Sequence, residues 1–166
     1  GERVRESLLR TTDGGRLPVV VDASSCAHGV AEVAAEAGIE VLDAVTFIAR
    51  EALDSLEVGA KLDSVTLHPT CSTAHMGTID DLRAVAEAAA EDVRIPVNWG
   101  CCGYAGDRGM LHPELTASAT KAEATTVAEL DSRYHASSNR TCELGMTQAT
   151  GEPYVHVLEL LERATR

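Results

Sequence analysis

Short runs of β-branched and aliphatic residues alternate with helical patterns along nearly the whole chain, and this alternation constrains the fold most. The runs predict strands at residues 17–22, 39–43, 64–68, 94–99, 133–137 and 154–157, the last being alternatively the start of a final helix. Helical stripes and caps occupy the intervals at 30–37, 46–56, 78–90 and 113–130. We therefore expect an α/β fold with a doubly wound, mostly parallel sheet and helices on both faces.

The length of 166 residues suits one domain. Residues 17–166 carry the strand–helix pattern, and residues 1–16 precede it as an extension or linker. The chain starts with the charged stretch 1–5 and lacks an initiator Met, which indicates a piece of a longer protein with a missing upstream domain.

Charge and composition limit the partners. The formal net charge is −12, so a phosphate backbone would be repelled and nucleic acid is not an expected partner. No apolar run is long enough to span a bilayer. We expect a cytoplasmic protein, or one peripheral at the inner face of the membrane. Aromatic residues make up only 3%, so the core must consist of Ala, Val, Leu and Ile.

The cysteines all follow predicted strands. They are Cys26, Cys71, the adjacent Cys101 and Cys102, and Cys142. About 30 residues separate Cys71 from Cys101 and about 40 separate Cys102 from Cys142, roughly one strand–helix–strand unit each. Because sites in open parallel sheets form beyond the carboxyl ends of the strands, these positions are predicted to converge at one edge.

Thiolates are soft ligands that select zinc, copper(I) or iron–sulfur clusters. Structural zinc sites usually take cysteines as pairs two residues apart, whereas Cys101 and Cys102 are adjacent between Gly100 and Gly103. Two adjacent thiolates can reach separate metal atoms, which favours a larger inorganic group. Three alternatives stay open: a structural zinc domain that uses a histidine, a cofactor-free docking domain with buried cysteines, and a strained Cys101–Cys102 disulfide.

The segments 20–26, 101–109 and 137–143 carry a family resemblance. The chain resembles the cysteine-rich "CCG" domain of heterodisulfide reductases, anaerobic glycerol-3-phosphate dehydrogenase and lactate-utilisation proteins. From about Leu17 onward it is most similar to the C-terminal domain of bacterial FAD/iron–sulfur D-lactate dehydrogenases. Where the wider family has Cys-x-x-Cys, this chain has Asn139 and Cys142.

The resemblance implies a ligand set of Cys71, Cys101, Cys102 and Cys142. Four cysteines suffice for a 4Fe–4S cluster, and the missing cysteine argues against a larger noncubane cluster. An isolated fragment can lose such a cluster or exchange it for zinc. Residues that lie near these ligands in the sequence are expected to approach or tune the group, and a histidine among them could bind metal if the cluster is absent. These are Cys26, His68, His75, Gly103 and Asn139.

The implied parent enzyme oxidises D-lactate or a related D-2-hydroxy acid at FAD. The chain lacks the G-x-G-x-x-G nucleotide fingerprint, so FAD and substrate are expected in an upstream domain of the same chain, and no catalytic residue is expected here. The fragment would relay electrons from reduced flavin to a quinone, cytochrome or protein acceptor. Alternatively it belongs to a heterodisulfide-reductase-like or glycerol-3-phosphate-dehydrogenase-like complex.

Overall fold

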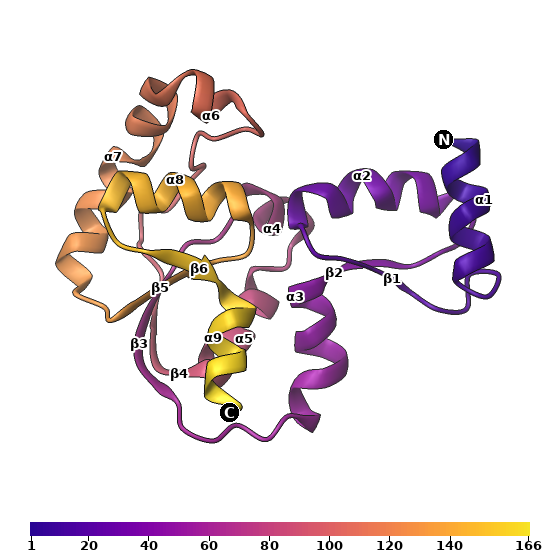
Figure 1. The fold of residues 1–166 in the computed structure, drawn as a ribbon, viewed down its shortest axis with the longest axis horizontal. Coiled ribbons are helices and arrows are strands. Elements are labelled where there is room, and N and C mark those ends of the chain that lie inside the picture. The colour runs from indigo at the N-terminus through magenta and orange to yellow at the C-terminus, as the bar shows by residue number, and fades with distance from the viewer.

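The structure, a computed structural model, describes all residues from 1 to 166 (Figure 1). Strands and helices alternate along the chain. The first half contains α1 (Glu2–Thr11), β1 (Val19–Val21), α2 (Ser24–Ala35), β2 (Val41–Asp43), α3 (Ala44–Phe47), a π-helical turn η1 (Ile48–Ala52) and a 3₁₀ turn η2 (Leu53–Ser55). The second half contains β3 (Leu62–Leu67), α4 (Cys71–Met76), α5 (Ile79–Ala89), β4 (Ala90–Arg94), α6 (Arg108–Leu111), α7 (Pro113–Leu130), β5 (Tyr134–Ser137), α8 (Arg140–Thr150), β6 (Tyr154–His156) and α9 (Val157–Ala164).

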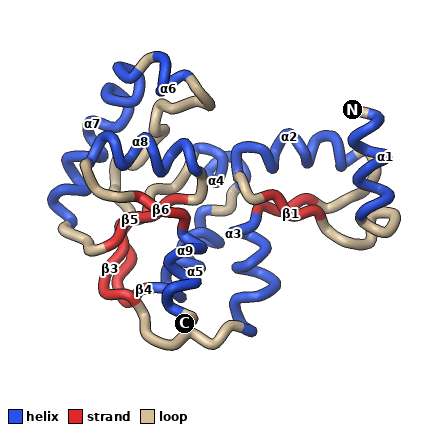
Figure 2. The backbone as a smooth tube through the Cα atoms, in the orientation of Figure 1, coloured by secondary structure: helices blue, strands red, loops and turns tan.

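The main sheet has four parallel strands in the order β4-β3-β5-β6. The predicted doubly wound α/β class is thus confirmed. The sheet does not include the first two strands, because β1 and β2 pair only with each other, in parallel, as a separate two-stranded sheet. Figures 1 and 2 show this small sheet with α1 and α2 to one side of the main sheet, and α4 at the junction.

The two faces of the main sheet differ in chemistry. One face packs against α5 and α9, which also contact each other. The core on this side is built only from Val, Leu and Ala, as the scarcity of aromatic residues predicted. The opposite face is covered by α7 and α8 and carries more polar side chains.

The strand β3 explains how this polar face arises. Side chains alternate across a strand, so Val65 and Leu67 enter the aliphatic core while Thr66 points to the other side. Thr66 donates to Ser132 there at 2.8 Å. The same alternation carries His68, just past the end of the strand, toward α7.

Several predicted boundaries are wrong. The fourth strand is Ala90–Arg94, not 94–99, because Pro96 has no N–H for a ladder and α5 runs directly into the strand. Helix α2 begins at Ser24, so Cys26 lies in its first turn rather than in a loop. The helix expected at 46–56 covers 44–55 with a π-helical interruption. The strand expected at 17–22 forms as β1 but is not buried, since Val20 is 44% exposed.

Within the predicted extension, residues 2–11 form the helix α1, which the sequence reading did not foresee. Arg5 of α1 forms an ion pair of 3.6 Å with Glu36, just after α2. None of the helices combines the length and the apolar composition needed to cross a bilayer.

Candidate functional site

Four of the five cysteines follow three strands of the main sheet. Cys71 is the first residue of α4, after β3, and Cys142 lies in the first turn of α8, after β5. Cys101 and Cys102 lie in the long loop between β4 and α6. Since these strands are neighbours in the sheet, their carboxyl ends deliver the three segments to one edge.

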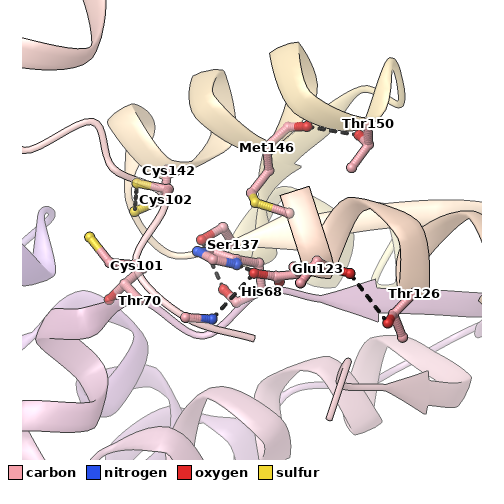
Figure 3. Close-up of polar contacts among 12 residues, drawn as sticks. His68, Thr70, Cys101, Cys102, Glu123, Thr126, Ser137, Cys142, Met146 and Thr150 are labelled. Carbon is pink, nitrogen blue, oxygen red and sulfur yellow. Dashed lines mark hydrogen bonds and ion pairs between the residues drawn. The ribbon is translucent and has the colours of Figure 1, made fainter. Parts of the chain in front are cut away.

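Cys102 and Cys142 are in direct contact. Their sulfur atoms are 3.2 Å apart in a thiol–thiol hydrogen bond, and both residues are buried (Figure 3). The hydrogen bond with Cys142 lowers the pKa of Cys102 to about 6, helped by the Tyr104 backbone N–H and the charge of His68. The same hydrogen bond and burial raise the pKa of Cys142. The two thiols therefore titrate as one coupled pair, in which the first proton is lost more readily than from an isolated thiol and the second less readily.

Cys101 and Cys71 extend the cluster toward solvent, and both are exposed. Partial burial raises the pKa of Cys101, although its sulfur accepts a hydrogen bond of 3.4 Å from the Gly103 N–H. The neighbouring Cys71 thiol raises the pKa of Cys101 further, and Cys71 and Cys101 both raise that of Cys142. Cys71 and Cys101 therefore lie within electrostatic reach of Cys142 and of each other.

Glycines allow the cysteine loop to pack closely. Gly103 has a left-handed φ of +72°, and a β-carbon there would lie 2.9 Å from the Leu115 carbonyl oxygen. Gly145 of α8 faces the same loop, because a β-carbon on it would lie 3.0 Å from the Tyr104 ring and 3.4 Å from the β-carbon of Cys102. Gly103 was expected near the site, but Gly145 was missed because a single helical glycine gives no signal of what it faces.

A buried pair of polar side chains lies behind the cysteines. The Nδ1 atom of His68 is 2.7 Å from Oε1 of Glu123 on α7, and both side chains are almost completely buried. The second carboxylate oxygen of Glu123 accepts the Gly100 N–H at 3.3 Å. Nε2 of His68 is buried without a hydrogen-bond partner. The sequence did not indicate Glu123, because nothing local distinguishes a buried glutamate on this 18-residue helix from a solvent-facing one.

The remaining expected residues lie around the site without joining it. Cys26 is exposed in α2, and no hydrogen bond links it to the other cysteines. His75 is on the exposed part of α4, with its ring edge-on to His28 at 5.1 Å between centroids. Asn139 precedes α8 and is mostly buried, but its side chain makes no capping hydrogen bond.

A hydrogen-bonded contact anchors the Cys71 turn to the first half of the chain. The Thr70 hydroxyl lies 3.3 Å from that of Ser24, at the start of α2, and both residues are buried. The same Thr70 hydroxyl accepts the Thr73 N–H at 3.1 Å and so caps α4. The start of α4, where Cys71 lies, is therefore held by contacts of Thr70 with both α4 and α2.

The donor chemistry suits a soft metal group, because the side chains in and beside the contact are thiols. No three His, Cys, Asp or Glu side chains stand close enough together to hold a single metal ion in this geometry. The sulfur separation of 3.2 Å is also shorter than the roughly 3.8 Å that two thiolates adopt on one tetrahedral zinc with bonds of about 2.3 Å. The Cys102 and Cys142 thiols must therefore move apart to take up a metal.

Comparison with known proteins gave no further guide, since no family model matches the chain and no curated protein does.

Proposed function

We propose that this chain is the electron-transfer domain of a flavin and iron–sulfur dehydrogenase, and that Cys71, Cys101, Cys102 and Cys142 hold a 4Fe–4S cluster. The observation that supports the proposal is the contact of Cys102 and Cys142 at 3.2 Å, with Cys71 and Cys101 near enough to influence the pKa values at this edge of the sheet. Such a cluster accepts and releases one electron at a time.

The four cysteines form a buried pair and an exposed pair, and we propose a different role for each pair. Cys102 and Cys142 are buried in a cluster with Tyr104 and would anchor the group in the protein. Cys71 and Cys101 lie at the surface. Electrons would enter and leave on that exposed side, where reduced flavin from the upstream domain and a quinone, cytochrome or protein acceptor can approach.

The substrate class rests on the resemblance alone. D-Lactate or a related D-2-hydroxy acid would be oxidised at FAD in an upstream domain, and the present chain would contribute no residue to that step. Its part is to position the cluster and to set its environment. The isolated chain is accordingly proposed to be redox-active but not catalytic.

Anaerobic reconstitution of the metal-free chain with ferrous iron and sulfide tests the proposal. We expect broad visible absorption that bleaches on reduction with dithionite and returns when a quinone is added. The Cys26→Ala chain is the matched control and should behave like the wild type. Absence of sulfide uptake by the folded wild-type chain would contradict the proposal.

A single zinc ion is the second candidate, because neighbouring cysteine thiols and a histidine held by a carboxylate are donor types that zinc binds. Zinc would then bind at one equivalent, survive in air, and give no visible absorption. Metal analysis of the anaerobically purified chain separates the two candidates.

A further inference from the structure

We propose that His68 donates a hydrogen bond from Nε2 to the sulfur-bound group at the cysteine site, and that Glu123 is the residue that positions it. The inference rests on the proposed function for its ligand, but its geometric basis is independent of it. The basis is the buried contact of 2.7 Å between Nδ1 of His68 and Glu123, together with the unpartnered, buried Nε2 on the other side of the ring.

The carboxylate of Glu123 is fixed at both oxygen atoms. One oxygen meets Nδ1 of His68, and the other accepts the Gly100 N–H at 3.3 Å, next to the cysteine pair in sequence. The carboxylate can accept from Nδ1 of His68 at one oxygen while the Gly100 N–H donates to the other. A buried carboxylate is expensive without an opposite charge, and His68 is the group that can supply one. A protonated His68 leaves Nε2 as a donor.

The ring is oriented so that this donor faces the cysteines. Figure 3 shows His68 between Glu123 on one side and Cys102 with Cys142 on the other. The charge of His68 acts on Cys102, which places the two groups within electrostatic reach. The backbone of His68 is held as well, because its N–H donates to Ala136 and its carbonyl accepts from the Ser137 hydroxyl at 3.0 Å. The ring therefore has little freedom to turn away.

The expected consequence is a higher reduction potential. Hydrogen bonds to cluster sulfurs and nearby positive charge stabilise the more negative, reduced state. The dyad is thus a device that sets the potential of the group, not a ligand. It also explains why a histidine and a glutamate are buried together under a helix that could have presented aliphatic side chains.

The first test uses the reconstituted chain. His68→Leu and Glu123→Gln should both keep wild-type iron and sulfide content and both shift the reduction potential to more negative values. His68→Gln keeps an N–H donor and should shift it less, while His75→Leu, on exposed α4, should leave it unchanged. An unchanged potential in folded His68→Leu would overturn the inference, and so would loss of metal, which would make His68 a ligand.

The second test uses ¹⁵N NMR of the metal-free chain, so it remains decisive if no cluster forms or if a His68 variant fails to fold. We expect both ring nitrogens of His68 to carry protons, with the Nε2–H resonance shifted by Cys102→Ala and unaffected by Cys26→Ala. A bare Nε2 would overturn the inference. Failure of cluster uptake with a protonated Nε2 that responds to Cys102→Ala would count against the proposed function only.

Discussion

At the residue scale, neighbouring side chains divide the cysteines into chemically different groups. Cys102 receives hydrogen bonds and a positive charge, so its pKa falls to about 6, whereas its partner Cys142 gives up a proton far less readily. Cys101 lies beside them with a raised pKa because of partial burial. The pKa values of the adjacent Cys101 and Cys102 are thus shifted in opposite directions, which no count of cysteines could indicate.

This difference predicts a pH dependence for the metal-free chain. One thiolate should appear with a midpoint near pH 6, followed by ultraviolet thiolate absorbance. Because the folded pKa of Cys102 lies below the ordinary value of about 8.5, its contribution to stability is present above that value and is lost as the pH falls through about 6. Cys142→Ala removes the donor and should move the midpoint upward, while Cys142→Ser keeps an O–H donor and should move it less. A midpoint unaffected by Cys142→Ala would contradict the assignment.

The glycine beside the pair makes a second prediction at this scale. Gly103 and Gly106 both have left-handed φ angles, +72° and +75°, but only Gly103 has neighbours within 4 Å of a built β-carbon. Gly106→Ala should cost about 1–2 kcal/mol of unfolding free energy from the backbone alone. Gly103→Ala should cost about 1–3 kcal/mol more because the Leu115 carbonyl must move. Urea unfolding of the two variants measures the difference, and equal losses would contradict the packing argument.

At the element scale, each cysteine segment depends on how its helix begins. α4 has six residues, too few to be stable alone, and its first residue is Cys71. The Thr70 hydroxyl caps it and also contacts Ser24 of α2. The position of Cys71 therefore depends on a cap shared between two parts of the molecule.

Thr70→Ala should destabilise the chain by about 1 kcal/mol through loss of this cap. Thr78 precedes α5 but makes no capping hydrogen bond, so Thr78→Ala is the matched control and should cost less. Thr70→Ser should retain most of the stability. Thermal unfolding measures the stability of the three variants. A loss of stability in Thr70→Ala no larger than that in Thr78→Ala would contradict the capping role of Thr70.

At the scale of the whole molecule, the order of strands and helices was readable from the sequence because hydrophobic runs and caps are local signals. The contact of Cys102 with Cys142 is consistent with the same order, since parallel crossovers return each strand end to one edge. The separation of β1 and β2 from the main sheet was not readable, because strand pairing depends on contacts between distant segments. The His68–Glu123 pair was hidden for the same reason, as 55 positions separate its members.

The central claim is that four particular sulfur atoms share one inorganic group, and a cysteine-by-cysteine measurement tests it most directly. Iron and acid-labile sulfide are determined in five anaerobically reconstituted chains, each with one cysteine changed to alanine, after each is shown to be folded by circular dichroism. The account predicts that Cys71→Ala, Cys101→Ala, Cys102→Ala and Cys142→Ala lose most of both, and that Cys26→Ala matches the wild type. Full iron and sulfide in any of the four folded variants, or their loss in Cys26→Ala, would contradict it.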